Sequence, residues 1–197
     1  MTQEEDGSVS LDSVNDLLLY QLRDLHSAER QILRVWPELI HQAQSRNLAL
    51  ALEEHRTETV RQIARLHECT EMLGASPHGV RCRGMEGLMI ECLANLASHR
   101  DPAVRDAGII ADCQRVEGYE LAVYGNARIF ARALRLEQVV GLLDRTIAEE
   151  EATDARLAAI AEHEVNPRAV ASAIRNAADD TKAIPITRAR RWRALQA

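Results

Sequence analysis

Acidic side chains recur at helical spacing in separate segments of this chain. Glu117 and Glu120 lie three residues apart, as do Glu151 and Asp154, and this spacing places both members of a pair on one face of a helix. Hard oxygen donors suit iron and manganese, and carboxylates from several helices can hold two metal ions inside a helical bundle. The candidate metal ligands are Glu29, His55, Glu58, Glu117, Glu120, Glu150, Glu151 and Asp154.

The place of these acids in the apolar pattern supports the metal hypothesis. Glu29 falls on the same helical stripe as Leu22, Leu25 and Ile32. Burying an unpaired carboxylate is costly, so an acid on a core face must be neutralised, paired or bound to a cation. Taken singly, each residue also has a plainer explanation: a solvated glutamate, a hydrogen-bonded core histidine, or an exposed charged face for EEEATD at 149–154.

Composition favours long helices as the elements that carry these residues. Glycine (9) and proline (5) are scarce in 197 residues, and aromatic residues make up only 3%, so Leu, Ile, Val and Ala must fill the core. Capping residues and apolar spacing predict one helix after Ser13 and a second from a turn at 45–47 to about Leu73. Further helices are predicted at 84–97, from Asp101-Pro102 to about Leu134, and at 136–164, where Asn166-Pro167 ends the last.

The lengths of the connections predict how these helices are arranged. The first two and the last two long helices are joined by short turns, so each pair forms an antiparallel hairpin, whereas residues 74–101 are long enough to cross the bundle. Two hairpins with one long crossover, here carrying the short helix, indicate an all-α, ferritin-like four-helix bundle over residues 11–166. LHSAERQI (25–32) superposes on VEGYELAV (116–123) with Glu29 on Glu120, so each hairpin is interpreted as half of a pseudo-twofold bundle.

Charge, hydropathy and cysteine pattern restrict the class of protein and its location. The net charge of −6 is too acidic for a protein that coats nucleic acid. There is no apolar run of about 18 residues to predict a membrane span, and the polar start MTQEEDGSVS is unlike a signal peptide. The cysteines form no CxxC pair, which fits buried thiols in a reduced cytoplasmic protein: Cys69, Cys82, Cys92 and Cys113.

Two terminal segments fall outside the predicted bundle. Residues 1–10 are expected to form a disordered leader, and residues 167–197 a basic tail. A basic cluster in the tail could make a weak electrostatic contact with nucleic acid or a membrane surface, although a solvated tail is the favoured interpretation. The cluster comprises Arg188, Arg190, Arg191, Trp192 and Arg193.

Taken together, the motifs resemble the YciE/YciF family, ferritin-like proteins associated with bacterial stress responses. The similarity covers nearly all of residues 11–166, and the combination of MEGL, VExYE and EExxTD motifs makes it specific. The matching segments are LLYQLRDLHSAERQI (18–32), EEHRTETVRQIARL (53–66), RCRGMEGLMIEC (81–92), RVEGYELAVYG (115–125) and LDRTIAEEEATDARL (143–157).

The resemblance implies a homodimeric four-helix bundle with a site for two iron or manganese ions of the rubrerythrin and ferritin type. Carried over by position, its ligands are Glu29, Glu117, Glu120, Glu150, Glu151 and Asp154. The second helix departs from the family pattern, because Thr57 replaces one of two adjacent glutamates and Val60 stands where some members have histidine. If Glu58 is the ligand the second half-site survives, and if Thr57 replaces a true ligand it is weakened.

Two functions are compatible with these observations. The first is a di-metal carboxylate protein that handles O₂, peroxide or ferrous iron in a stress response, and whether it is an enzyme of the oxidase or peroxidase type is left open. The alternative is a structural, stress-associated helical-bundle dimer whose metal site is incomplete or unused, which Thr57 and Val60 favour.

Overall fold

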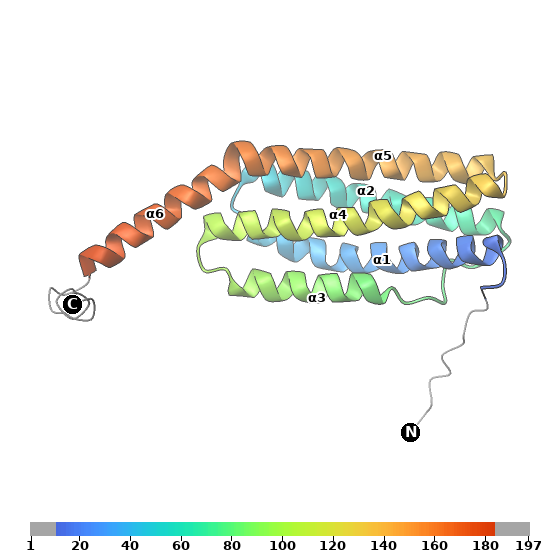
Figure 1. Cartoon of the computed structure of the whole chain (residues 1–197), viewed down its shortest axis with the longest axis horizontal. Coiled ribbons are helices and arrows are strands. Elements are labelled where there is room, and N and C mark those ends of the chain that lie inside the picture. The colour runs from blue at the N-terminus through green and yellow to red at the C-terminus, as the bar shows by residue number, and fades with distance from the viewer. Residues whose placement is uncertain (1–10, 184–197) are drawn as a thin grey trace, which may run out of the picture.

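The computed structural model describes residues 11–183, and all of their regular secondary structure is helical (Figure 1). The predicted leader and the arginine cluster at 188–193 lie outside the described residues. The elements are α1 (Val14–Gln42), α2 (Arg46–Met72), α3 (Arg83–Ser98), α4 (Pro102–Ala133), α5 (Glu137–Ile160), the π-helical turn η1 (Ala161–Val165) and α6 (Asn166–Ala183).

Side-chain caps fix where the long helices begin. The Ser13 hydroxyl accepts from the Asp16 amide at 3.1 Å and opens α1, and the Asp101 carboxylate accepts from the Ala103 amide at 2.8 Å and opens α4. The tight α1–α2 turn is closed by a second acid, because buried Asp106 accepts from the backbone amides of Gln44 and Ser45 at 2.8 Å each. These caps satisfy amides that would otherwise lack partners at helix ends.

Helices α1, α2, α4 and α5 form a four-helix bundle of two antiparallel hairpins (Figure 1). The crossover between the hairpins carries α3, which lies outside the four and packs along α1 and α4. The predicted all-α bundle with a helix-bearing crossover is therefore confirmed. Within residues 11–183, no helix has both the length and the apolar character needed to cross a membrane.

The bundle interior has two apolar clusters separated by a polar layer. One cluster surrounds Trp36 and Leu52 near the α1–α2 turn, and the other surrounds Leu22 and Leu143 toward the α4–α5 turn. The residues that lie between them along each helix are polar and buried: Glu29, His55, Thr59, Gln62, Glu117, Glu120, Glu150 and Thr153. A polar layer between two dry clusters is where a metal centre would be shielded from water.

The predicted end of the last bundle helix at Asn166-Pro167 is wrong. The chain stays helical through η1 into α6, which leaves the bundle at an angle (Figure 1). In η1 the Asn166 amide bonds to the Ala161 carbonyl, five residues back, and such a widened turn is one way a helix accommodates a break in its hydrogen-bond ladder near proline. Ser172 and Asn176 then donate to the Asp101 carboxylate at 2.6 and 3.0 Å and tie α6 to the start of α4.

Candidate metal centre

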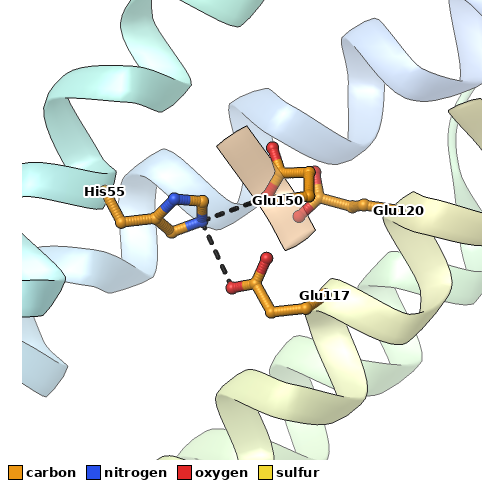
Figure 2. A group of neighbouring side chains, drawn as sticks. All are labelled: His55, Glu117, Glu120 and Glu150. Atoms are coloured by element: carbon orange, nitrogen blue, oxygen red, sulfur yellow. Dashed lines mark ion pairs between the residues drawn. The ribbon is translucent and has the colours of Figure 1, made fainter. Parts of the chain in front are cut away.

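Four buried side chains from three helices converge in the polar layer (Figure 2). His55 comes from α2, Glu117 and Glu120 from successive turns of α4, and Glu150 from α5, and one potential ligand atom of each lies within 4.8 Å of the others. Each side chain is at most 1% exposed. The sequence prediction that Glu117, Glu120, Glu150 and His55 face a common interior is thus supported by the geometry.

Several polar atoms of this cluster lack hydrogen-bond partners among the described residues. They are both carboxylate oxygens of Glu117, one oxygen each of Glu120 and Glu150, and Nε2 of His55. The His55 Nε2 atom lies 3.2 Å from a Glu117 oxygen and 3.6 Å from a Glu150 oxygen, as the dashed lines in Figure 2 show. Unpartnered oxygens that face one another in a dry interior are costly, and a cation between them would remove that cost.

Glu29 of α1 adds a fourth carboxylate beside Glu120. Glu29 is 1% exposed and accepts a hydrogen bond from the Tyr124 hydroxyl at 2.5 Å. The Glu29 and Glu120 carboxyl groups also interact with each other, and this interaction contributes to the pKa of both. Tyr124 therefore holds one carboxylate beside the cluster. A second tyrosine of α4, Tyr119, points elsewhere: it donates to Asp24 at 2.8 Å and contacts the Cys82 thiol at 2.9 Å.

Glu58 lies on the far side of the His55 ring from the cluster. Its carboxylate is 3.5 Å from His55 Nδ1, the Thr153 hydroxyl is 3.2 Å from the same nitrogen, and Glu58 is 26% exposed. A carboxylate on one ring nitrogen, with the other nitrogen free to face a metal, is the usual way proteins orient a histidine ligand. The predicted ligand Glu58 is thus better placed to orient His55 than to bind a metal itself.

Gln62 is a member of the layer that reasoning from sequence did not assign to the site. Its amide nitrogen donates to Glu150 at 2.5 Å and to Glu149 at 3.2 Å, while its oxygen is among the buried atoms without a partner. The signal that the sequence offered was its spacing, three residues after Thr59 and four before Leu66, which places Gln62 on the inward face of the helix. Gln62 fixes the orientation of the Glu150 carboxylate.

Burial and mutual repulsion change the protonation of the cluster. Burial raises the pKa of Glu29 to about 7, with the Tyr124 hydrogen bond opposing the shift. Burial and then repulsion from neighbouring carboxylates raise the pKa of Glu120 well above the ordinary value. Burial also raises the pKa of Glu150 well above the ordinary value, although the nearby His55 opposes the shift. For His55, burial lowers the pKa, but the neighbouring carboxylates of Glu117, Glu58 and Glu150 outweigh burial and hold the pKa well above 6.5. In the metal-free protein, bound protons therefore reduce the repulsion between the buried carboxylates.

Two predicted ligands lie outside the cluster. Glu151 is exposed, and Asp154 is partly exposed and accepts a hydrogen bond from the Gln114 amide at 2.9 Å. Within the run EEEATD, Glu150 is the one acid that is fully buried. The assignment of Glu151 and Asp154 as ligands is not supported, because both side chains reach solvent and neither joins the cluster.

The two departures from the family pattern on α2 also lie outside the cluster. Thr57 is exposed and donates to the backbone carbonyl of Glu53, and Val60 is 54% exposed. Neither position faces the polar layer, so neither substitution removes a side chain from it.

All four cysteines are free and buried, as the sequence indicated.

Comparison with known proteins shows the family to which the chain belongs. The family described as "Domain of unknown function (DUF892)" matches residues 13–170. The chain is 33% identical to Protein YciF of Escherichia coli (strain K12) over 162 residues, which are 82% of this chain and 98% of that protein.

Solved structures agree with that placement. The crystal structure of the E. coli stress protein YciF matches with a TM-score of 0.76 at 34% identity, covering 79% of this chain and 99% of that one. YcfI of Rhodopseudomonas palustris matches with a TM-score of 0.74 at 38% identity, covering 76% and 96%. The chain therefore belongs to the DUF892 family of YciF-like stress proteins, as its motifs indicated.

Proposed function

We propose that this protein binds iron or manganese in the polar layer of its bundle and acts on O₂, peroxide or ferrous iron during stress. The observation that carries the proposal is the set of unpartnered, buried oxygens of Glu117, Glu120 and Glu150 facing His55 Nε2. An imidazole with several carboxylates is a donor set that suits iron and manganese. The proposed site keeps the carboxylate-rich, ferritin-like character expected from the sequence, with a shorter ligand list.

The donor set divides unequally between two ions. His55, Glu117, Glu120 and Glu150 can all reach one position, so we assign the first ion to them. Glu29 and Glu120 offer a second, poorer position next to Tyr124. When bound, such ions supply redox and Lewis-acid chemistry at oxygen.

The protein's own residues would prepare the site for that chemistry. Glu58 and Thr153 orient His55, Gln62 orients Glu150, and Tyr124 holds a proton beside Glu29. The apolar clusters on both sides keep bulk water out, which strengthens the electrostatic interactions inside. The stress role, a bacterial cytoplasmic location and a homodimer are carried over as part of the proposal from the family resemblance.

A matched pair of neighbouring glutamates gives a sharp test. Purified full-length protein is loaded anaerobically with Fe(II) or Mn(II), and bound metal and melting temperature are measured for the unaltered chain, Glu150→Gln and the exposed control Glu151→Gln. We expect metal to raise the melting temperature, Glu150→Gln to lose most bound metal, and Glu151→Gln to retain it. No metal bound by the unaltered chain, or equal losses in the two variants, would refute the proposal.

A structural bundle without metal is the second candidate. One observation favours it: where α5 presents Glu150 to the layer, α2 presents Thr59 and Gln62, both neutral and fully buried. Shared protons, together with hydrogen bonds from Tyr124 to Glu29 and from Gln62 to Glu150, would then stabilise the buried carboxyl groups without a metal. Melting that is the same with chelator and with added metal would support this candidate.

A further inference from the structure

Three histidines meet near the surface, apart from the central cluster. His26 lies on α1, His67 on α2, and His78 in the 73–82 connection that begins the crossover. The centroid of the His26 ring lies 4.9 Å from that of His67 and 4.9 Å from that of His78. The His67 and His78 centroids are 5.9 Å apart, and the rings of all three pairs meet edge to face. Separate segments thus bring three imidazoles into mutual contact.

The closest pair faces nitrogen to nitrogen. Nε2 of His26 lies 3.1 Å from Nε2 of His67. Two nitrogens at this distance either share one proton or bind one ion, because two ligands of a tetrahedral Zn²⁺ with bonds of about 2.0–2.1 Å lie about 3.3 Å apart. Imidazole nitrogen is a preferred donor for zinc, unlike the carboxylate-rich centre of the bundle.

The three rings differ in exposure in a way that suits a metal site. His26 is 3% exposed, His67 is partly buried and His78 is exposed. The ring nitrogens of the three histidines do not yet converge on one point in this structure, so zinc binding requires the exposed His78 side chain to rotate toward His26 and His67.

A surface cavity of about 550 Å³ opens beside His26 and His78. Its wall includes Arg30, Arg34 and Arg81, which disfavour a bare cation. They favour an ion that carries an anionic fourth ligand, and water bound to zinc ionises near neutral pH to supply hydroxide. The cavity leaves room for that ligand.

We propose that His26, His67 and His78 bind one Zn²⁺ ion, with a hydroxide or another small anion from the arginine-lined cavity as the fourth ligand. The ion joins α1 and α2 to the crossover connection, which is already held by the bond from Arg23 to the Ser76 carbonyl at 2.9 Å. This site is independent of the central cluster, because it shares no ligand with it.

The test counts zinc on the full-length protein by equilibrium dialysis and uses Co²⁺ as a spectroscopic probe, since nitrogen-bound tetrahedral Co²⁺ absorbs visible light. The variant is His67→Asn with His78→Asn, which spares the buried ring. The control is His41→Asn, an exposed histidine near the other end of α1. Circular dichroism checks that each variant keeps its helices.

We expect the double variant to lose one equivalent of Zn²⁺ and the visible Co²⁺ bands, and the control to keep both. Glu150→Gln should also keep the Co²⁺ bands, which separates this site from the bundle centre. Equal zinc binding and equal spectra in the double variant and the control would overturn the proposal, leaving a shared proton between His26 and His67. Loss of the bands in Glu150→Gln would overturn it too, since they would then belong to the central cluster.

Discussion

Replacing Glu29 with glutamine should stabilise the metal-free protein at neutral and higher pH. Glutamine has the shape of a protonated glutamate, so its oxygen can still accept the hydrogen bond from Tyr124. Its amide can donate to Glu120, whereas two carboxylates at this position repel each other. The variant therefore keeps the packing and removes an ionisation that the buried site resists.

The size and direction of the effect follow from the pKa of Glu29, which burial raises from 4.5 to about 7. Between these values the native state holds a proton that the unfolded chain has released, so stability falls as pH rises through this window and levels off above it. A shift of about 2.5 pH units corresponds to about 3 kcal/mol as an upper limit. In a chain of this length that is a change in melting temperature of about 10 °C.

Urea unfolding with a chelator present, at about pH 5 and about pH 8, would measure this difference. Glu29→Gln should be more stable than the unaltered chain at the higher pH and close to it at the lower pH, while the exposed control Glu151→Gln should match the unaltered chain at both. If Glu29→Gln is destabilised at the higher pH, or if the unaltered metal-free chain gains stability across this range, the protonation argument is wrong.

Three further substitutions, one of them with a matched control, test other parts of the structure. Glu58→Gln should weaken metal binding about 10- to 100-fold through loss of histidine orientation, measured by metal titration. Gly84→Ala should cost about 1–3 kcal/mol, because its added carbon would lie 2.9 Å from the Tyr119 ring, whereas Gly87→Ala meets nothing within 4 Å and should be neutral or slightly stabilising in urea unfolding. Asp106→Ala strands two backbone amides and should cost about 3 kcal/mol by the same assay.

Much of the fold could be predicted because local signals and tertiary structure agree. Ser13 and Asp101-Pro102 begin helices where the capping pattern indicated, and the apolar stripe of the first helix is buried throughout. The last helix could not be predicted past Pro167, because the backbone restriction before proline is a local rule and the π-turn that bypasses it depends on contacts with α4.

The candidate site was predictable only as far as helical register is visible in the sequence. Glu29 and Glu120 sit among apolar neighbours, so their inward direction could be read directly. The sequence does not show which of the three adjacent glutamates at 149–151 faces the core. The packing of α5 in the bundle determines this, and Glu150 is the one that is fully buried. The contact of His26 with His67 and His78 depends on how α1, α2 and the crossover meet, and no spacing in the sequence encodes it.

The internal repeat explains why the polar layer is asymmetric. The offset that pairs Glu29 with Glu120 also pairs Thr59 with Glu150, and both members of each pair are buried. One half of the bundle thus lacks an acid that the other half has, and α2 supplies His55 one turn earlier instead. Because a second ion would have to bind on the side without that acid, Mn²⁺ titration should show one tight equivalent and a weaker second one. Two equal affinities would contradict this account of the site.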